Sequence, residues 1–307
     1  MIFRYAYRGG VWVDLEQPTE DEIRQIAQEF SISELIEKEL FSPTPAPLVV
    51  DGGTSILLVL HFPEQQGTEN GDIENQEIDF IVGDRFIVTA RYEVIAPLHH
   101  LKKLFETRDL VTGHESITTD VLLEILFAHL YAAIRDHTNH LTDCLERIER
   151  DMFDGRERVT VRAISNVSRA FLHLEAALAN QEEPLSRFLG ARTLHDLFDS
   201  SFNERAERIL AERAQAMRLI KTHRAVATEM RETNTALLES HQNEIMKTLT
   251  VITFIFLPLE LITFVFGMGA LGTPLKQNPH AFWIIIGSMF TLGMVITLFL
   301  ARKRWIF

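Results

Sequence analysis

Cysteine is nearly absent from this chain of 307 residues, which contains only Cys144. This excludes a disulfide framework and any metal centre built from several cysteines, and it fits a reducing compartment. Basic charge is also scarce, because 30 Lys and Arg stand against 43 Asp and Glu and leave a net charge of −13. A sequence-independent nucleic-acid binder needs a basic face to neutralise phosphates, so nucleic acid is not expected as a partner.

Catalytic signatures are missing as well. The chain has no HExxH motif, no P-loop and no GxSxG nucleophile elbow. A hydrolytic or nucleotide-driven mechanism therefore has no residues to support it, and we predict neither an enzyme nor an enzymatic cofactor. The first ten residues, MIFRYAYRGG, contain no apolar signal stretch.

Charge is distributed very unevenly along the chain. After Lys247 there is one acidic residue, Glu260, and the only basic residues are Lys276, Arg302, Lys303 and Arg304. All the other acids and bases precede this point. The sequence therefore predicts an acidic soluble part followed by a nearly uncharged C-terminal part.

Two apolar runs in the C-terminal part have the length of membrane spans. Residues 249–266 form a run of 18 residues with one charge, and residues 281–301 form a run of 21 with none. A hydrocarbon core of about 30 Å takes roughly 20 apolar residues as a helix. Pro258 is compatible with a membrane helix, where neighbouring groups satisfy the freed carbonyl. We predict two transmembrane helices; the alternative is an unusually apolar buried hairpin of a soluble protein.

Basic residues beside the two runs predict the orientation. Lys247 precedes the first run, residues 302–304 follow the second, and the connecting segment 267–280 has only Lys276. The positive-inside rule places both termini in the cytosol and the connecting loop outside. We therefore expect a multi-pass protein of the cell inner membrane, with the lipid bilayer as a partner.

Local patterns in the acidic part predict a small α/β module. Thr19 and Glu22 form a capping box that opens a helix at Glu20. Alternating apolar residues and turn signals predict strands over 11–15, 55–62, 78–82 and 85–90.

From Ile117 onward the pattern becomes helical. We expect helices over 117–153 and 159–189, with breaks at Asp154-Gly155 and near Pro184. No Gly or Pro occurs from Ala191 to Leu257. Most of that segment is therefore expected to be one helix, a stalk on the order of 100 Å long that runs into the first span.

A polar strip follows the first span at steps of three and four residues. Such a 3.5-residue repeat is what a helix presents to its neighbours in a left-handed bundle. Two helices cannot enclose water, so the strip predicts several copies of this span that face one another. We call the strip the seam; its members are Asn243, Met246, Thr250, Thr253, Leu257, Glu260, Phe264 and Gly267.

Glu260 is the strongest functional candidate on the seam. It lies eleven residues after Leu249, about 16 Å along the helix axis. An acid at that depth costs several kcal/mol unless it faces a bundle interior or a water-filled cavity, and a ring of carboxylates would attract cations. We therefore assign Glu260 as the metal-contacting residue of a pore. The alternatives are an acid tolerated near an interface and seam threonines that bond only to their own helix.

Short motifs at both ends of the chain match those of a known transporter family. The C-terminal matches are Asn243-Glu244-x-Met246-Lys247-x-Leu249-Thr250, Phe256-x-Pro258-Leu259, Gly267-Met268 and Arg302-Lys303-x-Trp305. The N-terminal ones are Trp12-Val13-Asp14-Leu15 with Pro18, Thr19 and Glu22, and Glu77-Ile78-Asp79-Phe80 followed by Phe86-Ile87-Val88-Thr89. Taken together, the chain resembles the CorA family of two-transmembrane divalent-cation transporters, over almost its whole length.

The resemblance implies an α/β/α cytosolic domain, a long stalk helix and two C-terminal transmembrane helices in a funnel-shaped homo-oligomer, a homopentamer. It also implies that Mg²⁺ moves down its electrochemical gradient, that Co²⁺ and Ni²⁺ pass too, and that intracellular Mg²⁺ closes the pore. The expected parts are 1–115 (α/β), 116–190 (helices), 191–248 (stalk), 249–266 (first, pore-lining span), 267–280 (external loop), 281–301 (second span) and 302–307 (basic tail). Pore-lining and gate residues would be Asn243, Met246, Leu249, Thr250, Thr253, Leu257 and Glu260, and Arg302, Lys303 and Arg304 would ring the cytosolic mouth.

One departure from the family concerns its Gly-Met-Asn signature. This chain has Gly267-Met268-Gly269, so the amide that meets the hydrated ion is missing. Mg²⁺ dehydrates reluctantly, and a glycine offers only backbone carbonyls to its water shell. Glu260 occupies a position commonly held by threonine in the family. We therefore predict that cation attraction has moved from the outer loop to Glu260.

Two other functions stay open from the sequence. One is a zinc transporter, with or without proton coupling, in which Glu260 carries the proton; the other is a non-conducting membrane-anchored sensor. His137, His140 and Cys144 have a spacing that can bind zinc. Apolar neighbours such as Leu141 favour a packed helix face instead.

Overall fold

The computed structural model describes residues 2–63, 75–112, 117–268 and 279–303. It divides into two compact units, Met1–Arg231 and Glu232–Phe307, and the boundary falls inside one long helix. The strands are β1 (Ile2–Tyr7), β2 (Gly10–Glu16), β3 (Leu48–Asp51), β4 (Ser55–Pro63), β5 (Asn75–Gly83) and β6 (Phe86–Arg91). The helices are α1 (Glu20–Glu29), α2 (Glu34–Glu39), α3 (Ala96–Thr112), α4 (Thr119–Phe153), α5 (Glu157–Leu189), α6 (Arg192–Leu197), α7 (Phe202–Gly267) and α8 (Ala281–Arg302).

The first unit is built on a six-stranded sheet in the order β1-β2-β6-β5-β4-β3. β2 and β6 pair in parallel, and the other neighbouring strands pair antiparallel. Gly10 is required where β2 begins, because a Cβ there would lie 1.9 Å from the carbonyl oxygen of Arg85. β4, β5 and β6 are buried along most of their length, as expected for a sheet with both faces covered.

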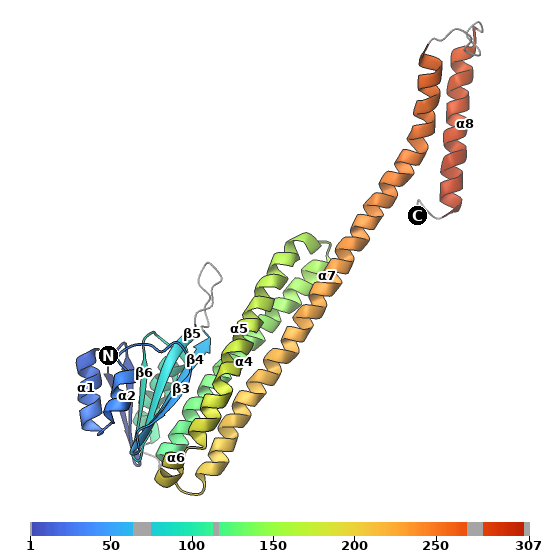
Figure 1. Cartoon of the computed structure of the whole chain (residues 1–307). Coiled ribbons are helices and arrows are strands. Elements are labelled where there is room, and N and C mark those ends of the chain that lie inside the picture. The colour runs from blue at the N-terminus through green and yellow to red at the C-terminus, as the bar shows by residue number, and fades with distance from the viewer. Residues whose placement is uncertain (1, 64–74, 113–116, 269–278, 304–307) are drawn as a thin grey trace. The chain divides into compact units, whose positions relative to one another are not determined.

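Helices cover both faces of this sheet, as Figure 1 shows. On one face, Val13, Ile81 and Val88 share a core with Ile26 of α1 and Ile36 of α2. On the other face, the Phe80 ring stacks on Phe127 of α4 with a centroid distance of 5.0 Å, and Phe62 lies 6.1 Å from Tyr131. The predicted α/β/α architecture is confirmed. The sequence patterns had not indicated β1, β3, α2 or α3.

The predicted capping box at the start of α1 is present. The Glu22 amide donates to Thr19 Oγ1 at 3.3 Å, and the Thr19 amide donates to Glu22 Oε2 at 2.9 Å. Both amides would otherwise lack a partner in the helix.

Thr19→Ala is expected to lower the free energy of unfolding by about 1 kcal/mol, because the cap hydroxyl is lost. Chemical unfolding of the full-length protein measures the change. Ser33→Ala is the matched control: Ser33 caps α2 without a side-chain hydrogen bond, and its buried hydroxyl has no partner among the described residues, so no loss of stability is expected. Equal losses in the two variants would contradict a stabilising role for the box.

The predicted helix break near Pro184 is wrong, because α5 continues through this residue to Leu189. Proline in a helix interior costs about 3 kcal/mol. Burial of neighbouring residues stabilises the helical turns around Pro184, because Gln181, Leu185 and Phe188 are fully buried. Gln181 also accepts a hydrogen bond from Tyr131 and donates one to the carbonyl oxygen of His61. Tertiary packing therefore outweighs the local preference.

Most of the segment after Ala191 is one helix, α7, as expected, but its first residues form a separate short helix. The short α6 ends at Leu197, and α7 begins at Phe202. The chain turns at Asp199, Ser200 and Ser201, residues whose side chains favour turns over helix interiors. From Phe202, α7 runs unbroken to Gly267 and passes through Pro258.

Candidate functional site

The second unit consists of the C-terminal part of α7 and α8, both long and apolar enough to cross a membrane. Within the described residues, the most apolar 18-residue stretch of α7 is 0% buried, and that of α8 is 6% buried. A core helix of a soluble protein would be mostly buried. These surfaces therefore need lipid or further protein to cover them.

One face of α7 packs against α8, and the two helices run side by side in Figure 1. The half-buried residues of this face are Val251, Ile255, Pro258, Leu259, Ile262 and Phe266. Gly293 allows a close approach, since a Cβ built on it would lie 3.8 Å from Leu259 Cδ1. Thr263 Oγ1 lies 3.9 Å from Met289 Sδ.

The seam lies on the opposite side of α7 from α8. Thr253, Leu257, Glu260 and Phe264 each precede a residue of the α8-facing side, namely Ile255, Leu259, Ile262 and Phe266, by two positions. Two positions correspond to about 200° of rotation around a helix. The seam is therefore not covered by α8, and its side chains can face another molecule.

The seam combines exposed apolar side chains with one acid. Met246, Leu257 and Phe264 are 53%, 61% and 63% exposed, and Glu260 is exposed beside them. Asn243 is also exposed, one turn before Met246. A carboxylate exposed to lipid among such residues has a high free-energy cost. This cost is lower when the seam faces other copies of the chain or water.

The hydroxyl groups of the seam threonines donate hydrogen bonds to carbonyl oxygens of their own helix. This was one of the alternatives considered from the sequence. Thr250 Oγ1 donates to the carbonyl oxygen of Met246 at 2.7 Å, and Thr253 Oγ1 donates to that of Leu249 at 2.9 Å. Each hydroxyl oxygen keeps lone pairs that can accept a hydrogen bond. These threonines can therefore still accept from the water shell of a cation.

The expected signature residues lie at the end of α7. Gly267 is the last residue of the helix, and a Cβ added to it would meet nothing within 4 Å in this chain. Met268 is 72% exposed, and Gly269 lies outside the described residues. Arg302 ends α8, and Lys303 follows with its Nζ 5.4 Å from the centroid of the Phe299 ring. Arg304 also lies outside the described residues.

In the first unit, ion pairs join α7 to α4. Arg205 Nε lies 2.5 Å from Asp120 Oδ2, and Arg208 Nε lies 2.6 Å from Glu124 Oε1. The hydrogen bond from Arg208 lowers the pKa of Glu124, so this pair is ionised at neutral pH. Polar contacts thus supplement apolar packing along this part of α7.

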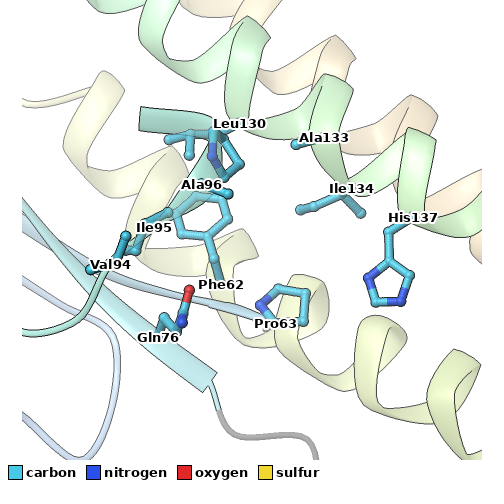
Figure 2. Close-up of a pocket in the computed structure, with 11 residues that line it drawn as sticks. Phe62, Pro63, Gln76, Val94, Ile95, Ala96, Leu130, Ala133, Ile134 and His137 are labelled. Atoms are coloured by element: carbon cyan, nitrogen blue, oxygen red, sulfur yellow. The ribbon is translucent and has the colours of Figure 1, made fainter. Parts of the chain in front are cut away.

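A pocket of about 270 Å³ lies between the sheet and α4 (Figure 2). Phe62 and Pro63 end β4, Gln76 belongs to β5, and Ile134 and His137 come from α4. The lining comes from segments distant in sequence, so no local pattern predicted it.

The predicted zinc spacing on α4 does not form a metal site among the described residues, where no three ligand side chains come together. His137 is half-buried, and Cys144 Sγ lies 3.0 Å from Arg147 Nη2. Burial, and then the nearby His140, lowers the pKa of His137. Of the three residues, His137 and Cys144 are half-buried and His140 is exposed, so only part of this face is packed.

Comparison with known proteins agrees with the fold. A family model described as CorA-like Mg²⁺ transporter protein matches residues 7–303. A cobalt/magnesium transport protein CorA from Methanocaldococcus jannaschii is 23% identical, over 96% of this chain and 91% of its own length. The divalent cation transporter CmaX from Pseudomonas aeruginosa is 24% identical, over 96% of this chain and 87% of its own.

The complete structure of the CorA magnesium transporter from M. jannaschii superposes with a TM-score of 0.80 at 21% identity. The superposition covers 97% of this chain and 92% of the M. jannaschii chain. The similarity therefore includes the α/β/α unit, the long helix and the two apolar helices.

Proposed function

The chain belongs to the CorA-like Mg²⁺ transporter family, and on this premise we propose that it carries divalent metal cations across a membrane. The family is one of transporters rather than enzymes. The observation that carries the proposal is the exposed Glu260 on a membrane-length helix, on the side opposite α8. Such a carboxylate is suited to attract cations once copies of the seam face one another.

The pore is formed, in this proposal, by α7 of several copies of the chain, with α8 on the outside. The family resemblance suggests five copies in a funnel-shaped assembly. Asn243, Met246, Leu249, Thr250, Thr253, Leu257 and Glu260 line the pore, and the apolar members form the gate. The position of the seam relative to α8 supports this arrangement, because all of these side chains except the half-buried Thr250 are exposed in the single chain.

Mg²⁺ is the proposed cargo, and Co²⁺ and Ni²⁺ are further candidates. The M. jannaschii relative is named a cobalt/magnesium transport protein, and the P. aeruginosa relative a divalent cation transporter. Gly267, Met268 and Gly269 stand where the family has its signature, and Glu260 takes over ion attraction from the missing Asn. Mg²⁺ is also the proposed regulatory cation that closes the pore from inside.

The proposed location is the cell inner membrane, with both termini in the cytosol. Lys247 before the first span and the basic residues after the second support it through the positive-inside rule. Arg302, Lys303 and Arg304 would then ring the cytosolic mouth of the pore. A zinc transporter with Glu260 as proton carrier is the second candidate, supported by the same single acid in the span.

Flux into liposomes tests the proposal. Purified full-length protein is reconstituted, and entry of Mg²⁺, Co²⁺ and Zn²⁺ is followed with an ion-sensitive dye inside the vesicles. We expect Mg²⁺ and Co²⁺ to enter several-fold faster than into protein-free vesicles, without a pH gradient. Zn²⁺ entry that rises with an inward proton gradient, without Mg²⁺ entry, would support the zinc transporter. No flux of any of these ions would support a non-conducting sensor.

A further inference from the structure

Two acids are buried side by side in the first unit, away from the proposed pore. Glu77 is 8% exposed and Asp79 is 1% exposed, and both belong to β5. Residues two apart in a strand point to the same face of the sheet. Ile81, two further on, belongs to the core shared with α1 and α2, so both acids lie under these two helices.

Glu77 contacts the segment that links α2 to β3, and Asp79 is connected to it through Tyr92. Glu77 Oε2 accepts a hydrogen bond from the Thr44 amide at 2.7 Å. His61 Nε2 lies 2.9 Å from the Thr44 carbonyl oxygen and 3.4 Å from Glu77 Oε2. Tyr92 Oη donates to the Leu40 carbonyl oxygen at 2.9 Å and lies 3.4 Å from Asp79 Oδ2. The backbone of residues 40–44 is thus held through the acids and their partners.

Each acid also has a buried oxygen without a protein hydrogen-bond partner among the described residues, Glu77 Oε1 and Asp79 Oδ1. An ionised carboxylate can only accept hydrogen bonds. Two adjacent buried carboxylates cannot both be ionised without a large cost in repulsion and desolvation. If one of them is protonated, its O–H becomes a donor in the buried site, and the repulsion between the two carboxylates is removed.

We propose that Glu77 and Asp79 hold one proton between them at neutral pH, and that losing this proton loosens the segment from Leu40 to Thr44. The pair is then a proton-binding site that makes the order of this segment depend on pH. It is independent of the proposed transport function.

The electrostatic surroundings agree with this assignment. Burial, followed by the charge of Glu77 and more weakly by that of Glu39 on α2, raises the pKa of Asp79 well above its usual value, while the Tyr92 hydrogen bond opposes the shift. The hydrogen bond with Glu77 raises the pKa of His61 on β4. Burial raises the pKa of Tyr92, so its hydroxyl stays a donor.

The raised pKa values of Asp79 and His61 have the same effect on the stability of the folded unit. A group whose pKa is higher in the folded state binds more protons there than in the unfolded chain. Its contribution is present at low pH and is lost as pH rises through the folded value. Asp79 and His61 both belong to this class, so raising the pH leaves growing negative charge in the buried site. Stability of the unit should therefore fall from mildly acidic to mildly alkaline pH.

Hydrogen–deuterium exchange on the full-length protein tests the proposal. Peptides that cover residues 40–44 are followed from mildly acidic to mildly alkaline pH, after correction for the intrinsic exchange rate. We expect their protection to fall with pH in the wild type, together with a drop of at least about 2 °C in the melting temperature. In Asp79→Asn the amide is neutral at every pH and only His61 is left to titrate, so the pH dependence of protection should be clearly smaller than in the wild type.

Asp84→Asn is the matched control, because Asp84 lies exposed in the turn that follows β5. It should respond to pH as the wild type does. Glu77→Gln serves as a second variant should Asp79→Asn fail to fold, and its response to pH should also be smaller than in the wild type. Protection in the wild type that is independent of pH would overturn the proposal. Protection that EDTA removes and Mg²⁺ restores at constant pH would overturn it too, because a metal ion would then occupy the site.

Discussion

Glu260→Gln is expected to lower the rate of Mg²⁺ and Co²⁺ entry into liposomes about tenfold or more. Glutamine keeps the size of the side chain and removes its charge. If several copies of the seam enclose the pore, the change removes a whole ring of negative charge from the ion path. A tenfold effect corresponds to about 1.4 kcal/mol in the barrier, a modest demand on such a ring.

Two variants complete this experiment. Glu260→Asp keeps the charge and should retain most of the flux. Thr263→Val lies one turn away on the α8 side, where Thr263 Oγ1 contacts Met289, and it should leave flux unchanged. Wild-type flux in Glu260→Gln, with unchanged assembly by size-exclusion chromatography, would show that Glu260 does not act on the ion. Loss only of a Zn²⁺ flux driven by protons would favour the second candidate function.

Arg91→Met is expected to cause a large loss of stability in the α/β unit. The Arg91 side chain is fully buried, with Nη2 2.9 Å from Asp14 Oδ2 and 2.6 Å from Glu16 Oε2. Thr89 Oγ1 donates to Asp14 Oδ1 at 2.8 Å and accepts from Trp12 Nε1 at 3.0 Å. The network joins β2 to β6, the parallel pair of the sheet.

Removing the guanidinium leaves Asp14, which is 1% exposed, as a buried charge without its cation. Such a loss costs about 3–5 kcal/mol, or about 6–20 °C in melting temperature for a unit of this size. Circular dichroism during heating measures it. Arg4→Met is the control, because Arg4 pairs with Glu29 at the surface and such pairs contribute at most about 1 kcal/mol.

A double variant separates the buried charge from lost packing. Asp14→Asn combined with Arg91→Met removes both charges, so it should be more stable than Arg91→Met alone. If Arg91→Met had the same melting temperature as the Arg4→Met control, this would contradict the role assigned to the network. Equal stability of the single and double variants would place the loss in packing instead.

Features carried by neighbouring residues could be predicted from the sequence. The capping box at Thr19 and Glu22 needs only four consecutive residues, and the apolar runs of 249–266 and 281–301 need only composition. The seam needs only the helical repeat, which places Glu260 on the same strip as Leu257 and Thr253. Features that depend on distant segments could not be predicted in this way. Arg91 is paired with residues 75 and 77 positions away, and no local pattern announces such a pair.

The sequence by itself determined the division into an acidic α/β part and an apolar end, the resemblance to CorA and the strip that holds Glu260. These follow from hydrophobicity, charge and helical periodicity, which act within one or two turns of chain. Only the tertiary structure decided that α8 covers the side of α7 opposite this strip, that α5 survives Pro184, and that Asp79 and Glu77 share a buried site. In each case the deciding energy comes from burial against segments far away in the chain, and this energy exceeds the local preference of the residues involved.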